Sequence, residues 1–511
     1  MKTKYKIILC SLVMSISFGN IYSQKGQKDV HFYGHVNTDR DSVQLKAFFA
    51  KNFVFGQGYA ENIFLDIPVD NNGNFHFELP PIDHIGRINF YDKYSSSTLF
   101  SCQIVEPGDS VGMTVTIHDS SEPYYMKAEV WGKGSSKYEC TQALKRINNK
   151  YRISAAKDVN DCLKVSDSIL NENLLVLDKF RPELSTTAFG ILKADIIGDI
   201  YNYTLLAEPI CGDKFDGVLS KTISKKELLK KRKAFGDFIA KISISNIQIP
   251  DELVSLSSSY VNFLYIKAEC ELVFSRRGER FEFNELYKKL RGDFKGMLRE
   301  KLLTYCFAYP DMHNFFEYCD ADDYTACLHD ASSLIKTPWL KQYMTDLLKA
   351  RGKGEPAFEF IFPADSTFNE ISLSSLKGRV LLLDMWGYSC TACHLFANAL
   401  HEKVYPLFKG DSNFAIVSIM PTGSRAAYMR RLRGEGGVKY TFPEYINLFG
   451  GDSGSLGEQM ERHYNINAWP FILLVDKKGQ IYSSTIPFFI DANSPNVEKL
   501  IDLIKKALAD I

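Results

Sequence analysis

Two cysteines separated by two residues are the part of this sequence best suited to chemistry. The apolar run at residues 380–384 predicts a buried strand that ends in the carboxylate of Asp384. A short turn follows, and apolar residues at helical spacing come after Cys393. The pattern therefore predicts a strand, a turn, and then Cys390 and Cys393 at the first turn of a helix.

The first turn of a helix favours an ionised cysteine. Its N–H groups lack helical partners, and the positive end of the helix dipole lies there. A thiol with a pKa of about 8.5 is roughly 3 % ionised at pH 7, whereas one with a pKa of about 7 is roughly half ionised. We therefore expect Cys390 to be the attacking thiolate and Cys393 to close a disulfide with it, as thiol–disulfide exchange requires. A stable structural disulfide is the alternative.

Asp384 is the candidate base for this chemistry. Burial at the end of a strand raises the pKa of a carboxyl, because the charged form loses its hydration. A carboxyl with a raised pKa suits a base that works near neutral pH, and Asp384 would take the proton of Cys393 through a water molecule. An exposed or capping aspartate is the alternative.

The chain from Gly354 onward resembles the thioredoxin fold and, within it, the exported TlpA/ResA-like reductases. The resemblance rests on the C-x-x-C motif after a buried strand and on Asp384, six residues before the first cysteine, where thioredoxins keep a buried acid. It rests also on residues 467–479, which are similar to the family's cis-proline strand and hairpin turn.

The resemblance implies a thiol–disulfide oxidoreductase whose partners are a protein disulfide or dithiol and a membrane electron donor. Pro470 would be cis, beside the cysteines, with backbone that pairs with an extended substrate. An ordinary trans proline at a strand start is the alternative. Trp469 and Trp386 would either form an apolar platform for the partner or belong to the core. We expect no cofactor and no metal.

This chain departs from the family pattern around the cysteines. Ser389 stands where the family usually has Trp, Phe396 where many members have Glu, and Asn398 where they have Pro. The departures leave the predicted fold intact. They leave open the redox potential and the net direction of the reaction, which could be reduction, oxidation or isomerisation.

Two other functions remain open. His394 completes the pattern C-x-x-C-H, which attaches haem covalently in c-type haem proteins. A small haem domain needs neither the preceding strand nor Asp384 nor the Pro470 strand, so haem is the lesser alternative. The other alternative is a binding or scaffold protein with a vestigial redox domain.

A chain of 511 residues is too long for one ordinary core and predicts about three domains. Short strand-like runs between turn signals predict a β-sandwich at 28–135 with no catalytic cluster. Apolar helix faces predict an α-helical domain at 136–351, and alternating strands and helices predict an α/β thioredoxin-like domain at 354–511. Four residues of the helical segment lie near one another in the sequence, but in no familiar zinc spacing: His313, Cys319, Cys327 and His329.

Residues 1–23 have the pattern of a signal peptide. Lys2, Lys4 and Lys6 precede an apolar stretch that is too short for a stable membrane span, and Ser23 is a plausible cleavage point. An uncleaved anchor is the alternative. We expect the mature protein in a periplasm or cell envelope. Its 61 basic and 61 acidic residues balance, which argues against nucleic acid as the main partner.

Overall fold

The computed structural model describes residues 28–39, 43–50, 53–55, 57–58, 62–92, 98–117, 126–148, 153, 156–207, 210, 224–244, 249–276, 281–308, 319–364, 369–452, 454–466, 468–490 and 492–510. The predicted signal peptide at 1–23 and His313 lie outside the described residues. The chain divides into two compact units, Met1–Lys51 with Ile63–Tyr138, and Asn52–Asn62 with Glu139–Ile511. The multidomain organisation with sheets and helices agrees with expectation, while the predicted domain boundaries stay predictions.

Strands dominate the described part of the first unit, where they form two four-stranded sheets. One has the order β10-β9-β1-β6: β10 (Met126–Lys133), β9 (Ser110–Ile117), β1 (Lys28–Thr38) and β6 (Asn74–Ile82). The other has the order β5-β2-β7-β8: β5 (Asn62–Ile67), β2 (Leu45–Ala50), β7 (Gly86–Asp92) and β8 (Thr98–Val105). Buried side chains of both sheets join one hydrophobic cluster. The strand-rich character predicted here is confirmed, whereas the assignment as a β-sandwich stays a prediction.

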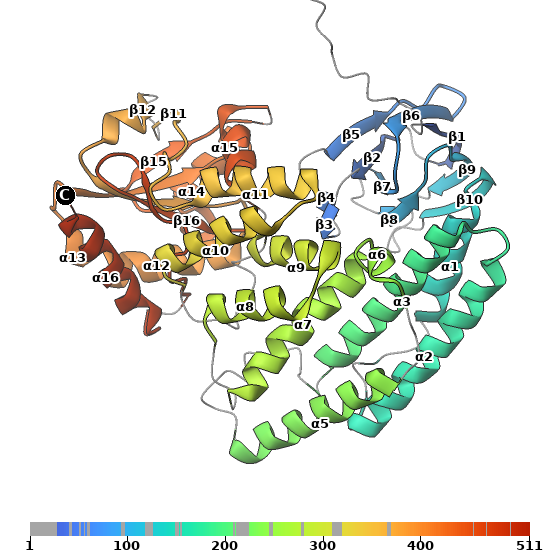
Figure 1. Cartoon of the computed structure of the whole chain (residues 1–511). Coiled ribbons are helices and arrows are strands. Elements are labelled where there is room, and N and C mark those ends of the chain that lie inside the picture. Colours follow the sequence, from blue (N-terminus) through green and yellow to red (C-terminus); the bar gives the residue numbers. More distant parts are fainter. Residues whose placement is uncertain are drawn as a thin grey trace, which may run out of the picture. The chain divides into compact units, whose positions relative to one another are not determined.

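Helices form most of the second unit before residue 352, as Figure 1 shows. They are α1 (Ser136–Asn148), α2 (Val159–Phe180), α3 (Thr186–Leu206), α5 (Lys225–Ile244), α6 (Asp251–Val254), α7 (Ser258–Ser275), α8 (Phe283–Asp293), α9 (Gly296–Ala308), α10 (Ala321–Leu334) and α11 (Pro338–Arg351). Two short strands, β3 (Phe53–Phe55) and β4 (Gln57–Gly58), pair within the same unit. Gly198 lets α3 and α7 approach, because a Cβ there would lie 2.3 Å from the backbone nitrogen of Tyr260. Of the helices in the described residues, none combines the length and apolar character that a membrane span needs.

The C-terminal domain is organised around a five-stranded sheet of order β15-β14-β13-β16-β17. Its strands are β13 (Val380–Met385), β14 (Phe414–Met420), β15 (Ile446–Phe449), β16 (Phe471–Val475) and β17 (Ile481–Ser483). The central strand β13 is buried along its whole length; it runs parallel to β14 and antiparallel to β16. A strand covered on both faces needs apolar residues at successive positions, which explains the uninterrupted run at 380–383.

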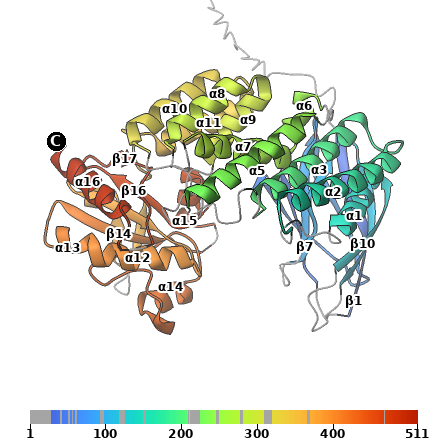
Figure 2. The ribbon, with the colours of Figure 1, turned by 90° about the horizontal axis from the view of Figure 1, so that it is seen from below.

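Helices cover both faces of this sheet. On one face α12 (Thr391–Lys403) and α16 (Asn496–Ala509) pack over Val380 and Leu382, and Figure 2 shows both helices beside β14 and β16. On the other face α11 and α15 (Leu456–Tyr464) pack over Leu381 and Leu383. The smaller elements are β11 (Ile361–Pro363), β12 (Glu370–Ser372), η3 (Ser374–Leu376), α13 (Tyr405–Phe408), α14 (Arg425–Leu432) and η4 (Glu435–Gly437).

One strand of this domain begins later than the sequence predicts. The pattern around Phe442 predicts a strand, but β15 begins at Ile446 and a turn precedes it, in which the N–H of Tyr445 donates to the carbonyl oxygen of Phe442. Pro443 explains the difference, because a proline has no N–H to donate to a neighbouring strand.

Candidate active site

Cys390 and Cys393 form a disulfide at the start of α12, with Cα atoms 5.3 Å apart. Cys390 is the N-cap residue of the helix, and its sulfur accepts a hydrogen bond from the backbone N–H of Cys393 across 3.0 Å. The same N–H can stabilise a thiolate on Cys390. Cys390 is partly exposed, whereas Cys393 is 1 % exposed. A partner can therefore reach the sulfur of Cys390 directly, while that of Cys393 is shielded.

The turn from β13 to α12 holds Cys390 at the helix start. The N–H of Trp386 donates to the carbonyl oxygen of Ile419, which adds one backbone hydrogen bond to β14 after the end of β13. Glycine is needed at Gly387, because a Cβ there would lie 2.6 Å from the ring of Trp469. Ser389 follows with φ of 69°, in the left-handed region that residues other than glycine adopt uncommonly. The path of the turn thus depends on close packing as well as on local sequence.

Asp384 lies on β13 and is 1 % exposed. Burial raises the pKa of its carboxyl from 3.8 to about 7, because the charged form loses its hydration. Its Oδ1 has no hydrogen-bond partner among the residues that the structure describes. Side chains alternate along a strand, so Asp384 lies on the same face as Val380 and Leu382, the face that carries α12. Such a carboxyl can accept and return a proton near neutral pH.

Ser418 and Tyr445 are neighbours of Asp384 that the sequence analysis missed. Ser418 pairs with Asp384 across β13 and β14, and its Oγ accepts a hydrogen bond of 2.9 Å from the indole N–H of Trp386. Burial raises the pKa of Tyr445, and the charge of Asp384 raises it further. A serine within an apolar strand was an available signal for Ser418. Tyr445 had none, because the turn before β15 brings it near Asp384 only in the folded chain.

Trp469 and Pro470 lie immediately before β16. The peptide bond between them is cis, as the sequence led us to expect. Phe471, the next residue, pairs with Met385 at the end of β13, so Pro470 lies next to the point where the turn to the cysteines begins. Trp469 and Cys390 both pack against a hydrophobic cluster that contains Cys393. The fold thus brings the predicted proline strand and the cysteines together.

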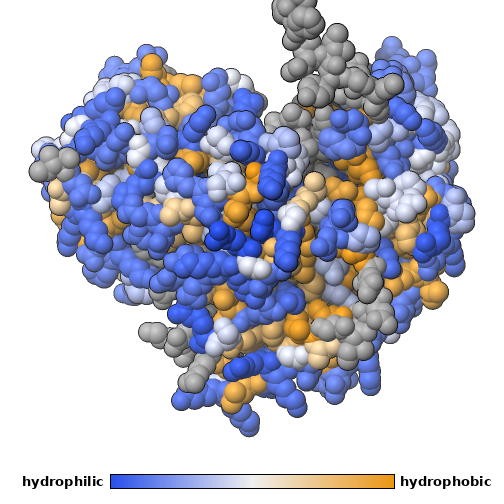
Figure 3. All heavy atoms as spheres, in the orientation of Figure 1, coloured by the Kyte–Doolittle hydropathy of each residue, from blue (hydrophilic) through white to orange (hydrophobic). Residues whose placement is uncertain are grey.

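Trp386 belongs to the core. Its side chain is 1 % exposed and its ring stacks on Tyr428, with 6.2 Å between ring centroids. This supports the core alternative for Trp386 over the exposed platform. The exposed apolar side chains that flank the cysteines are instead Tyr388 and Leu395, which are 45 % and 36 % exposed. In the view of Figure 3 the surface of the C-terminal domain is mostly hydrophilic, with smaller hydrophobic patches.

Arg351, at the end of α11, holds the segment that leads to Trp469. Its Nε donates to the carbonyl oxygen of Tyr464 across 2.8 Å, and its Nη2 to that of Asn465 across 2.9 Å. These carbonyls end α15, where helical partners are lacking. The side-chain amide of Asn465 also donates to the hydroxyl of Tyr343 on α11, across 2.7 Å. Helix α11 therefore positions the approach to the proline strand, a role that the sequence pattern did not predict.

The residues considered for zinc in the helical segment do not form a metal site within the described part of the chain. Cys319, Cys327 and His329 belong to no group whose donor atoms lie close enough to share an ion. His394, which completes the haem-type pattern, lies in the first turn of α12 with its Nδ1 3.1 Å from the carbonyl oxygen of Lys439.

Residues 378–481 match the family model described as thioredoxin-like. This match and the sheet order confirm the predicted recognition of a thioredoxin-fold domain in the C-terminal part of the chain. No curated protein matches the chain.

Solved structures similar to this chain include thiol–disulfide oxidoreductases from Bacteroides species. The thioredoxin domain of one from Bacteroides vulgatus has 19 % identity, covers 31 % of this chain and 99 % of that chain, and gives a TM-score of 0.26. A thiol–disulfide oxidoreductase from Bacteroides fragilis has 22 % identity, covers 26 % of this chain and 90 % of that chain, and gives a TM-score of 0.22. A thioredoxin-like protein from Bacteroides caccae has 13 % identity, covers 56 % of this chain and 95 % of that chain, and gives a TM-score of 0.32.

Proposed function

We propose that this chain, whose residues 378–481 form a thioredoxin-like domain, is an exported thiol–disulfide oxidoreductase that reduces disulfides in other proteins. The observation that carries the proposal is the disulfide between Cys390, partly exposed at the N-cap of α12, and Cys393, buried one turn later. An accessible sulfur at the positive end of a helix can attack, and a shielded sulfur within bonding reach can resolve the product.

The reaction starts from the dithiol form of the enzyme. The Cys390 thiolate attacks one sulfur of the partner's disulfide, forms a mixed disulfide and releases the partner's other sulfur as a thiolate, which takes up a proton. The Cys393 thiolate then attacks Sγ of Cys390 and releases the partner's second sulfur. The electron pair passes to the partner, and the enzyme is left with the disulfide that the structure contains.

Asp384 serves as the base for the second step. The thiol of Cys393 must lose its proton before it attacks, and the buried position of this sulfur limits direct access of solvent to it. A carboxyl with a pKa of about 7 is partly ionised at neutral pH and can accept this proton through a water molecule. It can return the proton when the enzyme is reduced again.

The surroundings of the cysteines suit a protein partner better than a small thiol. Tyr388 precedes the two cysteines and Leu395 follows them, and both expose apolar surface. Trp469 packs against the same hydrophobic cluster as Cys390. An extended segment of the partner would cover this surface while its backbone pairs with the chain at Pro470. Aromatic and apolar contacts of this kind hold a segment in place while the disulfide is exchanged.

Export and the source of electrons are parts of the proposal that the sequence supports. Residues 1–23 have the pattern of a signal peptide, and disulfides persist in the compartments that such peptides lead to. A dithiol reductase there needs an electron source to restore Cys390 and Cys393 after each turnover, and a membrane electron donor would supply it. Cell fractionation of the full-length protein tests the location; a cytosolic protein with residues 1–23 intact would contradict this part.

A disulfide-turnover assay tests the activity. The reduced protein should cleave a chromogenic aromatic disulfide, and Cys390→Ser should lower the rate by a factor on the order of 10³, because the attacking thiolate is lost. Cys327→Ala is the matched control, since it removes a buried thiol from the helices, and it should leave the rate within about twofold. Turnover that is absent, or that is indifferent to Cys390→Ser, would favour a binding or scaffold protein with a vestigial redox domain. A Soret band in the purified protein would favour haem attachment.

A trapping experiment identifies the partner. With Cys393→Ala the mixed disulfide cannot be resolved, so the partner should remain on Cys390 and be released by a reductant. Mass spectrometry then names it. The double variant with Cys390→Ser is the control and should capture nothing by this route.

A further inference from the structure

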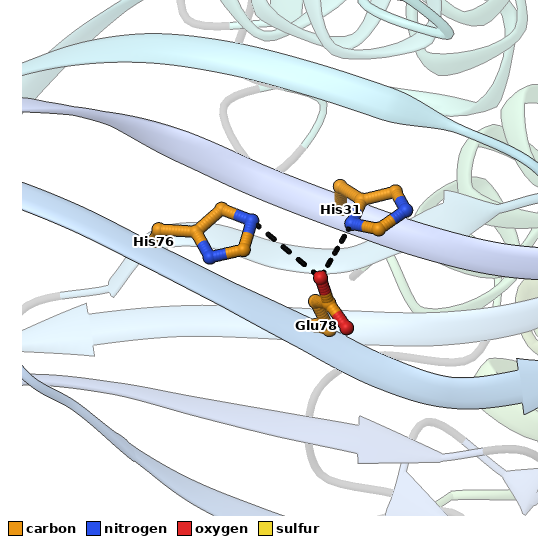
Figure 4. Close-up of side chains that lie close together, drawn as sticks. All are labelled: His31, His76 and Glu78. Carbon is orange, nitrogen blue, oxygen red and sulfur yellow. Dashed lines mark ion pairs between the residues drawn. The ribbon is translucent and has the colours of Figure 1, made fainter.

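Two histidines and a glutamate lie close together in the first unit, although His31 is far from the other two in the sequence. His31 lies on β1, and His76 and Glu78 lie on β6. The antiparallel register places His31 directly opposite Glu78, with His76 two residues before it on the same strand. Residues two apart share a face of a strand, so all three side chains emerge on one side of the sheet. Figure 4 shows both imidazoles directed toward the carboxylate.

The donor atoms are spaced as ligands of one ion would be. Nδ1 of His31 lies 3.1 Å from Oε1 of Glu78, and Nε2 of His76 lies 3.8 Å from the same oxygen. The three donor atoms all lie within 4.8 Å of one another. Tetrahedral ligands about 2.1 Å from a zinc ion are roughly 3.4 Å apart. Small side-chain rotations would therefore suffice to bring all three donors onto one ion.

Buried side chains on the opposite face of β1 and β6 fix the backbone at the three ligand positions. Phe32 and Phe77, which alternate with the histidines, stack in the core with 4.9 Å between ring centroids. Val30 and Leu79 are also buried on that side. Because the backbone at each ligand position is fixed by buried neighbours on both strands, the three donors lose little additional freedom when they bind an ion.

The three side chains share one small region of the strand surface, so a single cation could contact all of them at once. Two imidazoles approach a single carboxylate oxygen, and their rings lie nearly parallel with 6.1 Å between centroids. One cation held between two neutral imidazoles and a carboxylate satisfies all three side chains.

We propose that His31, His76 and Glu78 form a binding site for a divalent transition-metal ion, with Zn²⁺ as its representative. Two imidazoles and a carboxylate are a ligand set that zinc uses where a fourth position stays open. Since His76 and Glu78 are more than half exposed, that position faces solvent and can take a water molecule. We expected no metal from the sequence, because these three ligands come together only when β1 and β6 pair.

Zinc titration of the full chain tests the proposal. The protein is kept oxidised, so that Cys390 and Cys393 cannot bind the ion, and calorimetry counts the bound zinc. We expect one saturable equivalent in the wild type. His76→Ala and Glu78→Gln should each weaken binding by about 100-fold or more, because each removes a ligand. The matched control is His84→Ala, which removes an exposed histidine that pairs with Asp83, and it should bind as the wild type does.

A second measurement separates ligand loss from unfolding. Thermal unfolding without zinc should be nearly the same for Glu78→Gln and the wild type, whereas added zinc should raise the midpoint for the wild type alone. Co²⁺ in place of zinc should give a visible absorption spectrum that is absent from Glu78→Gln. Zinc binding that is absent, or that is unchanged in His76→Ala and Glu78→Gln, would overturn the proposal.

Discussion

One cysteine of this chain lies at the N-terminus of a helix and another near the C-terminus of a different helix, and only the first position suits a thiolate. Cys390 caps the N-terminus of α12, is partly exposed and accepts a backbone hydrogen bond. Cys306 lies in the last turn of α9, near the negative end of the helix dipole, and is fully buried. Burial raises the pKa of the Cys306 thiol, and the charge of Glu269 raises it further.

Three other cysteines of the helices, Cys140, Cys162 and Cys327, are buried as Cys306 is. Burial raises the pKa of Cys140 to about 12 and that of Cys162 and Cys327 to about 11. These thiols act as small apolar side chains in the packed helices. The difference teaches that access of solvent decides whether a sulfur reacts, because Cys162 lies in the first turn of α2 and is nevertheless buried with a raised pKa.

The region around Cys390 and the helical region around Cys306 each contain a buried carboxyl. Burial raises the pKa of Asp384 on β13 and that of Glu269 on α7. Asp384 lies on the strand that leads to the exposed sulfur of Cys390, whereas Glu269 is enclosed by the helices together with Tyr265. A raised pKa therefore indicates an active site only where an accessible reactive group lies nearby.

The largest expected difference between the two regions is in the rate of alkylation. In the reduced chain at pH 7, Cys390 should react with iodoacetamide about 10³ times faster than Cys306, because a buried thiol reacts only when the helices open. Mass spectrometry of timed samples measures both rates. In denaturant the two rates should become similar. Similar rates in the folded chain would remove the basis of the comparison.

Asp384→Asn should raise the free energy of unfolding of the oxidised chain at pH 8 by up to about 4 kcal/mol, which is a factor of about 10³ in the folding equilibrium constant. The carboxyl pKa rises from 3.8 to about 7 on folding, so at pH 8 the folded wild type contains a buried charge. The contribution of Asp384 to the free energy of unfolding is highest below pH 3.8 and falls as the pH rises to about 7. The variant should lack this fall in thermal unfolding followed from pH 3 to pH 8. Asp452→Asn, at an exposed position, should retain it.

The same variant should slow the resolving step by about 100-fold at pH 7, because the thiol of Cys393 loses its base. The first attack by Cys390 should change little. Quenched samples of a reaction with a peptide disulfide should therefore accumulate mixed disulfide, which gel electrophoresis measures. The difference between the variant and the wild type in the rate of the resolving step should decrease as the pH rises, because hydroxide then acts as the base. Equal accumulation in Asp384→Asn and Asp452→Asn would show that Asp384 has no part in this step.

The smallest expected effect concerns the exposed apolar surface beside the cysteines. Leu395→Ala should raise the KM for a protein disulfide about fivefold and leave kcat nearly unchanged, because it removes apolar contact area from the partner's site. Leu407→Ala, at an exposed position on α13, is the control and should leave both constants as they are. A loss of kcat alone would mean that Leu395 acts on the chemistry and not on partner binding.

Much of the C-terminal domain was predictable, because its signals are local. The apolar run at 380–384 corresponds to Val380–Met385, and the helical spacing after the cysteines corresponds to Thr391–Lys403. Both patterns follow from backbone geometry within one element. The strand expected near Phe442 begins only at Ile446, because Pro443 has no N–H to donate to a neighbouring strand.

The sequence by itself determined that two sulfurs stand one helical turn apart and that a carboxylate ends the strand before them. The tertiary structure decided that Trp386 is buried and that Ser418 and Tyr445 lie beside Asp384. It alone placed His31 opposite Glu78. These properties depend on which strands pair and on packing between distant segments, and the pattern within one element specifies neither.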